Sequence, residues 1–190
     1  MKKILYVITL AIAAMGFTSC LDTSVEDQYK DWRKANNDWL IEQSMKVDEH
    51  GKLFYTPVVA PWDPNARVLI HWFNDREETK DNLSPLYTST VDVKYKGCLY
   101  DGTPFDSSFL SKSPADSIAR FTLSATATSR GMIEGWGIAL PQMHVGDSCR
   151  ILIDYPQGYG VYSVSSIIKP FSVLSFDIKL VDIYHYGSNL

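Results

Sequence analysis

The sequence predicts an α+β domain in which an antiparallel sheet packs on one short helix, with a longer helix appended at the N-terminus. Two observations carry this prediction. Residues 24–46 place apolar side chains at helical spacing, whereas after residue 52 short runs of β-branched and aromatic residues alternate with turn residues. The chain's 190 residues, of which 45% are hydrophobic, suit one globular domain with an appendage.

Composition excludes several classes of protein. High apolar content and a formal net charge of −4 exclude an intrinsically disordered chain and leave no basic footprint for nucleic acid. Three cysteines are too few for a disulfide-rich scaffold or a four-cysteine zinc site, and no two of the 4 histidines have metal-ligand spacing. We therefore expect no metal, no cofactor and no nucleic-acid partner.

Residues 1–19 predict a lipoprotein signal peptide. Two lysines precede an apolar run from Ile4 to Phe17, as in a secretory signal. The following Thr18-Ser19-Cys20 resembles a bacterial lipobox, so Cys20 would become the first mature residue and carry the acyl chains that anchor the protein to a membrane. The alternative is a plain secretory signal followed by an incidental cysteine.

This interpretation places the mature chain in the cell envelope. Leu21 is not the acidic residue that often marks inner-membrane retention in some bacteria, which favours the outer membrane. Disulfides can form in that compartment. Alternation nevertheless places Cys98 on the polar face of one strand and Cys149 on the apolar face of another, so we expect no disulfide between them.

The lipid-anchored segment 20–50 contains the predicted helix at 24–46. Ser24 can cap this helix, with Asp27 three residues later, in a variant of the capping box. Its apolar residues favour a helix that packs on its own domain. The alternative is a dimerisation or spacer helix that holds the domain away from the membrane.

Residues 51–190 form the predicted domain, with its motifs in a core at 89–184. Pro57 indicates that the first strand lies at an edge of the sheet, and the polar stretch at 75–88 predicts a surface loop. A short helix near 134–141 ends at Pro141. The predicted strands are 53–60, 66–73, 89–100, 118–124, 147–154 and 172–184.

Several short motifs stand in order along this core. They are Val91-Asp92-Val93-Lys94-Tyr95-Lys96-Gly97, Asp101-Gly102-Thr103-Pro104-Phe105-Asp106-Ser107-Ser108, Met132-Ile133-Glu134-Gly135-Trp136-Gly137, Gly158-Tyr159-Gly160, Ile168-Lys169-Pro170 and Leu174-Ser175-Phe176-Asp177-Ile178. In order, spacing and residue type they resemble FKBP-type peptidyl-prolyl cis-trans isomerases. The resemblance covers residues 66–184 and implies a twisted antiparallel sheet wrapped around one short helix, with an apolar pocket between them.

The resemblance also implies a set of site residues. The expected catalytic residues are Tyr95, Phe105, Asp106, Trp136, Tyr159 and Phe176. The expected substrate-binding residues are Met132, Ile133 and Ile168.

Each of these residues has an expected role. Trp136 would be the pocket floor, with Tyr95, Phe105 and Phe176 as aromatic walls. Asp106 would be the one buried acid. The Ile133 N–H and the Tyr159 hydroxyl would donate to substrate carbonyls. The alternative is that the aromatic residues are ordinary core and that Asp106 only caps a turn.

The implied function is peptidyl-prolyl isomerisation in exported proteins. Expected partners are proline-containing unfolded polypeptides, macrolides of the FK506 class, and a membrane through the lipid anchor. Segments 124–130 and 161–167 depart from the family pattern around the pocket mouth, which favours an alternative, a non-catalytic binding or chaperone lipoprotein. A third possibility is an interaction lipoprotein that works through the 24–46 helix and a 52–75 hairpin.

Overall fold

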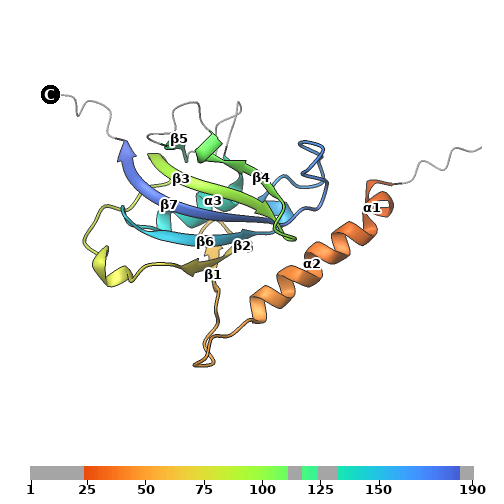
Figure 1. The fold of residues 1–190 in the computed structure, drawn as a ribbon, viewed down its shortest axis with the longest axis horizontal. Coiled ribbons are helices and arrows are strands. Elements are labelled where there is room, and N and C mark those ends of the chain that lie inside the picture. The colour runs from red at the N-terminus through yellow and green to blue at the C-terminus, as the bar shows by residue number, and fades with distance from the viewer. Residues whose placement is uncertain (1–23, 111–116, 124–131, 185–190) are drawn as a thin grey trace, which may run out of the picture.

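A seven-stranded antiparallel sheet curves around one short helix in the computed structural model, which describes residues 24–110, 117–123 and 132–184 (Figure 1). The strand order is β1-β2-β6-β7-β3-β4, and β5 also pairs with β3. The strands are β1 (Thr56–Ala60), β2 (Asp63–Trp72), β3 (Thr90–Leu99), β4 (Pro104–Ser107), β5 (Ala119–Thr122), β6 (Ser148–Ile153) and β7 (Leu174–Tyr184).

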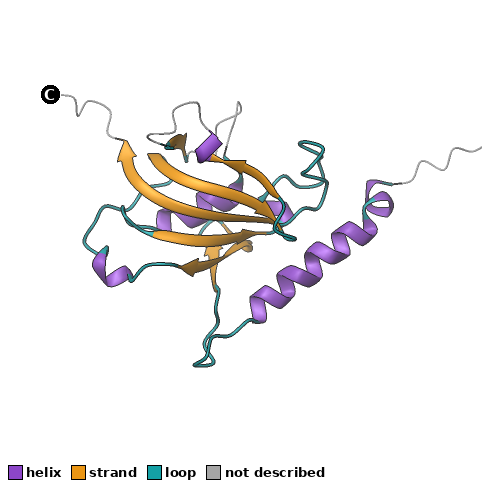
Figure 2. Ribbon diagram, in the orientation of Figure 1, coloured by secondary structure: helices purple, strands orange, loops and turns teal. Residues whose placement is uncertain are grey.

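The long N-terminal helix lies to one side of the sheet, and a short helix lies against the sheet (Figure 2). Two helices precede the sheet, and a third lies against its inner face. They are α1 (Val25–Gln28), α2 (Lys30–Met45) and α3 (Glu134–Ala139). Short 3₁₀ turns are η1 (Arg76–Glu78), η2 (Ser108–Leu110), η3 (Leu140–Gln142) and η4 (Tyr155–Gln157). The α+β class and the appended N-terminal helix are therefore confirmed.

Alternation along the strands separates an inner from an outer face. In β3, Val91, Val93 and Tyr95 are buried in the core that includes α3, while Asp92 and Lys94 between them lie on the other face and are only half-buried. The close approach of α3 to β6 requires glycine, because a Cβ at Gly135 would lie 2.5 Å from Cγ2 of Ile153. The main core therefore lies between the inner face and α3.

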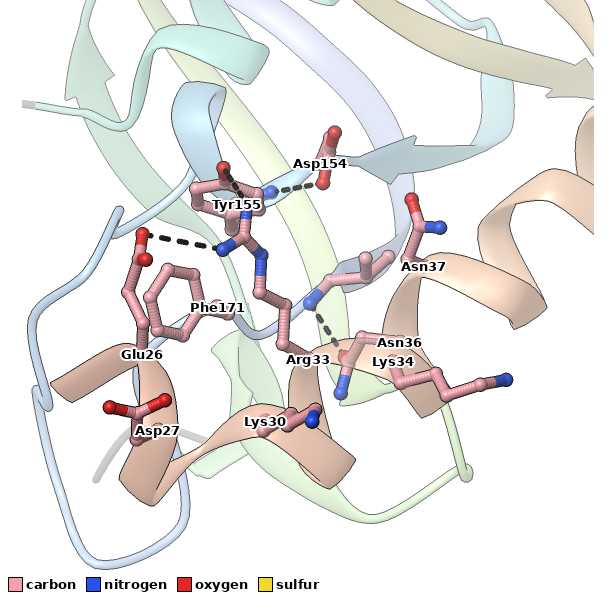
Figure 3. A pocket seen from close by; sticks show the side chains of 11 residues that line it. Glu26, Asp27, Lys30, Arg33, Lys34, Asn36, Asn37, Asp154, Tyr155 and Phe171 are labelled. Atoms are coloured by element: carbon pink, nitrogen blue, oxygen red, sulfur yellow. Dashed lines mark hydrogen bonds and ion pairs between the residues drawn. The ribbon is translucent and has the colours of Figure 1, made fainter. Parts of the chain in front are cut away.

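The N-terminal helix packs on its own domain, as the first interpretation predicts. The buried Asn36 accepts a hydrogen bond from the backbone N–H of Val173 at 2.8 Å, and Trp32 donates through Nε1 to Ser172 at 3.2 Å. Arg33 lies over the ring of Phe171, 4.8 Å from its centroid (Figure 3). These contacts fix α2 against the segment that leads into β7.

The predicted single helix is divided in two. Ser24 caps α1 by accepting from the Asp27 N–H at 3.2 Å, as expected. Tyr29 then leaves helical geometry, with φ −111° and ψ 18°, before α2 begins. The capping prediction is confirmed, while the uninterrupted helix over 24–46 was wrong.

The first hairpin also differs from its prediction. The sheet begins later, at Thr56, and β2 begins earlier, at Asp63, so the turn shrinks to residues 61 and 62. The Asp63 carboxylate accepts from the Asn65 N–H at 2.8 Å. This hydrogen bond holds residues 63–65, which the sequence predicts as a turn, at the start of the strand. Pro57 does lie on the edge strand, as predicted.

Three further expectations concern the remaining segments. The stretch 75–88 is not wholly a surface loop, because Thr79 and Pro85 are buried.

Cys98 is half-buried, Cys149 is buried, and both thiols are free, as predicted. The predicted signal peptide and Cys20 lie outside the described residues, and no helix within the described residues is long and apolar enough to cross a membrane.

Candidate active site

A small pocket lies between the inner face of the sheet and the N-terminal end of α3. It has a volume of about 110 Å³. The wall of the pocket is formed by strands β3, β4, β5 and β7, by helix α3 with the residues directly before it, and by the segment after η4. The residues that line it are Tyr95, Asp106, Phe121, Met132, Ile133, Trp136, Tyr159 and Phe176.

Trp136 is the centre of an aromatic cluster. Its ring meets Tyr95 and Phe176 at centroid distances of 5.2 Å each and Phe121 at 5.4 Å, all edge to face. Such pairs contribute about 0.5–1.5 kcal/mol each beyond their buried area. The indole N–H of Trp136 is buried and has no acceptor among the described residues, so ring contacts hold this side chain in place.

Phe105 stands behind the pocket wall. Its ring meets Phe176 edge to face at 5.4 Å, but it is not among the residues that line the pocket. Glycine is required beside this pair, because a Cβ at Gly97 would lie 2.7 Å from Phe105 and 2.8 Å from Phe176. Phe105 therefore supports the wall instead of forming it, contrary to the prediction.

Asp106 and Tyr95 form the polar side of the pocket. The Tyr95 hydroxyl donates to Asp106 Oδ2 at 2.7 Å, and the Ser107 N–H donates to Asp106 Oδ1 at 2.8 Å. Burial is the main cause that raises the pKa of Tyr95 well above its usual range, and the hydrogen bond to Asp106 adds to the effect. The phenol therefore stays protonated at physiological pH.

The prediction of a buried acid at position 106 was wrong. Asp106 is exposed, because it lies in the four-residue edge strand β4, which pairs only with β3. Its two carboxylate oxygens accept from the Tyr95 hydroxyl and the Ser107 N–H, and the side chain as a whole is exposed to solvent. The site therefore contains a solvated acid instead of a desolvated one.

Tyr159 lies across the pocket on the segment after η4. The turn that presents it closes with a hydrogen bond from the Gly160 N–H to the Tyr155 carbonyl at 2.8 Å, and Gly160 has φ +65°, which favours glycine. Burial raises the pKa of Tyr159, and the negative charge of Asp106 adds to the effect. Its hydroxyl is therefore a donor at neutral pH.

Two placements were not foreseen. Ile168 is buried in the main core and does not line the pocket, although the seven residues before it, 161–167, are exposed. Phe121 lines the pocket but escaped the sequence analysis. It lies in the predicted strand at 118–124, where it pairs with Val91, so alternation along that strand was the available signal.

The comparisons with known proteins agree on one family. The family model described as FKBP-type peptidyl-prolyl cis-trans isomerase matches residues 84–181. The macrophage infectivity potentiator of Trypanosoma cruzi is 36% identical over 104 residues, which cover 55% of this chain and 48% of that protein. The FKBP-type 22 kDa peptidyl-prolyl cis-trans isomerase of Escherichia coli is 37% identical over 99 residues, 52% of this chain and 43% of that one.

A solved structure shares the fold. The crystal structure of a peptidyl-prolyl cis-trans isomerase from Pseudomonas syringae superposes with a TM-score of 0.62 at 24% identity, covering 83% of this chain and 96% of that one. The two curated relatives above extend further, since the matched region spans less than half of each.

Proposed function

Because the chain belongs to the FKBP-type peptidyl-prolyl cis-trans isomerase family, we propose that it catalyses rotation about X–Pro bonds in unfolded and exported polypeptides. The observation that carries this proposal is the aromatic pocket, in which three rings meet Trp136 edge to face. Proline has an apolar, rigid ring, and a floor and walls made of aromatic rings suit it.

The reaction needs a particular environment more than a reactive group. Amide resonance sets a barrier of about 18–20 kcal/mol, and uncatalysed rotation takes on the order of 10–100 s. The twisted transition state has less charge separation than the planar amide. An apolar pocket therefore disfavours the planar ground state more than the twisted state, which lowers the barrier.

Two hydrogen-bond donors on the rim would orient the substrate. Ile133 is the N-cap of α3, so its N–H lies before the first intrahelical hydrogen bonds and is available to a substrate carbonyl. The Tyr159 hydroxyl, kept protonated by burial, would serve a second carbonyl. Met132 would add aliphatic contact at the mouth, while Ile168 and Phe105 would support the pocket from behind.

Paired tyrosine variants test the assignment of the site. Tyr159→Phe removes a hydroxyl from the pocket, whereas Tyr162→Phe makes the same change on a side chain that is 75% exposed and outside the lining. We expect kcat/KM on a Leu-Pro tetrapeptide to fall about 2- to 12-fold in the first variant, the range for one neutral hydrogen bond. Equal activity in both variants would remove Tyr159 from the mechanism.

A non-catalytic binding module is the second candidate. The observation that favours it is the run of exposed apolar residues directly after Tyr159, at Val161, Tyr162, Val164 and Ile167. Such a rim suits the capture of unfolded chains. A folded protein that binds proline-containing peptides in fluorescence anisotropy, yet leaves their isomerisation rate unchanged, would establish this alternative.

The same pocket is the proposed site for macrolides of the FK506 class. The aromatic floor and the two rim donors that would receive a proline segment also suit an apolar ring flanked by carbonyl groups. Inhibition of isomerisation by FK506, lost in Trp136→Leu, would support this ligand class.

We further propose that the chain is a lipoprotein of the outer membrane. Support comes from the lipobox-like Thr18-Ser19-Cys20 after an apolar run. Mass spectrometry of the membrane-extracted protein should find an acylated Cys20 at the N-terminus. Cys20→Ser should release the protein from the membrane fraction.

A further inference from the structure

Two exposed aromatic rings stand beside the pocket without contributing to the core. Trp62 lies in the turn between β1 and β2, and Tyr87 lies in the segment that leads into β3. Their rings meet edge to face at a centroid distance of 5.1 Å and an interplanar angle of 83°. Trp62 is 51% exposed and Tyr87 38%, so this Trp62–Tyr87 pair presents apolar surface to water.

The pair is attached to the helix that carries the pocket floor. Trp62 Nε1 donates to Oε1 of Glu134 at 3.0 Å. Glu134 is the first residue of α3, it follows the rim residue Ile133 directly, and Trp136 lies two residues further on. The Trp62–Tyr87 pair is therefore attached to the residue that adjoins the rim residue Ile133, at the same end of α3 as the pocket.

The local geometry leaves the pair ready for an apolar contact. Glu134 already satisfies the only polar group of the indole, so the exposed part of Trp62 needs no water partner. The hydrogen bond and the ring contact fix both side chains, which reduces the conformational entropy lost on binding. Leu86, which precedes Tyr87 in the sequence, is 71% exposed, and the buried Pro85 anchors that segment.

We propose that the Trp62–Tyr87 pair is a second contact for the substrate chain, which binds a large apolar or aromatic side chain a few residues from the proline. The proposal rests on the proposed function, because its occupant is the polypeptide whose proline fills the pocket. An extended chain advances about 3.3–3.6 Å per residue, so a side chain two to four positions from the proline lies about 7–14 Å from it. The preferred substrates would be polypeptides in which a large apolar or aromatic residue lies a few positions from the proline.

Peptide length and flanking residues test the proposal. The purified chain would be given a Leu-Pro tetrapeptide and fluorescein-labelled peptides of about twelve residues with a central Leu-Pro. In each longer peptide, either phenylalanine or serine stands three residues before or three residues after the proline. Isomerisation gives kcat and KM, and fluorescence anisotropy gives the dissociation constant independently of turnover.

The matched variants are Trp62→Ala and Phe73→Ala. Both remove an aromatic side chain that is 51% exposed, but Phe73 contacts His71 and Arg150 instead of α3. In Trp62→Ala we expect KM and the dissociation constant to rise about fivefold for the phenylalanine peptide whose phenylalanine lies on the side of the proline that reaches Trp62. The ratio of kcat/KM for that peptide to kcat/KM for the tetrapeptide should fall about fivefold as well. Phe73→Ala should keep the ratio, and Tyr87→Ala should lower it.

The outcomes separate the two proposals. If the protein accelerates neither peptide, the isomerase assignment fails, while anisotropy still decides whether Trp62 contacts the chain. If phenylalanine and serine peptides bind alike, or Trp62→Ala and Phe73→Ala give the same ratio, the second contact is refuted and the isomerase assignment is untouched.

Discussion

The two faces of the sheet are covered in different ways. On the inner face, α3 packs through the ring of Trp136 and through Ile138 and Ala139 into a continuous apolar core. On the outer face, a small separate cluster around Leu69 and Leu152 meets α2. There the firm anchor is polar, since the buried amide of Asn36 accepts from the Val173 N–H.

The same strands serve both faces. In β6, Ile151 and Ile153 face α3, whereas Arg150 points outward and forms a bidentate ion pair with Asp177 at 2.6 and 2.8 Å. The inner face cannot change shape without moving the pocket walls, because its residues are also those walls. The outer face supports an appendage and does not contact the pocket, so it should tolerate change with little effect on activity.

The largest expected difference comes from removing one tryptophan on each side. Trp136→Ala leaves a cavity in the inner core and should lower the free energy of unfolding by about 3–5 kcal/mol, with loss of isomerase activity. Trp39→Ala, at a half-buried position under the outer face, should cost less and leave kcat/KM unchanged. Urea denaturation and peptide isomerisation measure both; equal losses would show that the faces do not differ.

A methyl group added to α3 tests how closely the inner face is packed. In Gly135→Ala the new Cβ would lie 2.5 Å from Ile153, so we expect destabilisation by about 1–3 kcal/mol and altered substrate affinity. Gly137→Ala is the control, since nothing lies within 4 Å of its Cβ position. There the better helix propensity of alanine should stabilise the protein by up to about 1 kcal/mol. Thermal unfolding of both variants would reveal the opposite signs.

Removal of the outer anchor should separate stability from activity. Asn36→Ala leaves the buried Val173 N–H without its acceptor and should cost about 1–2 kcal/mol. Asn37→Ala, at the exposed neighbouring position, should change stability by less than about 0.5 kcal/mol. Neither should alter kcat/KM, as measured with the tetrapeptide. A large loss of activity in Asn36→Ala would mean that α2 reaches the pocket after all.

Acid pH probes Asp147, a fully buried carboxylate directly before β6. Burial alone would raise the pKa of Asp147, but hydrogen bonds from the His144 N–H, Thr79 and Asn74, together with the charge of Arg76, outweigh it and lower the pKa below 3.8. The unfolded state then binds the proton more readily, so stability from Asp147 is complete above pH 3.8 and is lost as pH falls through the lower folded value.

The measurement is urea denaturation as a function of pH. Wild type should lose stability progressively below pH 3.8, and Asp147→Asn should show a flatter profile there, although its stability at neutral pH is lower. Parallel profiles for the two proteins would contradict the assignment of Asp147 as the acid-sensitive group.

Much of the fold could be predicted because its signals are local. Alternation from Val91 to Leu99 identified β3 almost to the residue, and Pro141 correctly limited the short helix, which continues only as a 3₁₀ turn. The four-residue strand β4 was missed, because Asp101-Gly102-Thr103-Pro104 carries turn signals and β4 exists only through pairing with β3.

The candidate site could be predicted in part. The motifs and the family resemblance identified seven residues that line the pocket, but not Phe121, and they included Phe105 and Ile168, which pack behind it. They also gave Asp106 as buried. Whether a side chain lines a pocket, supports it or faces water depends on how far each neighbouring strand extends, which a motif does not encode.

The sequence by itself determined which residues face the core, since a strand has a period of two and a helix of 3.6 residues. It also determined the order of the motifs that place this chain in its family. Only the tertiary structure decided that α2 folds back on its own domain, through a bond between residues 137 positions apart, and that Trp62 stands beside the pocket, 72 positions before its partner Glu134. Contacts of that range arise from the packing of whole elements, which no local pattern specifies.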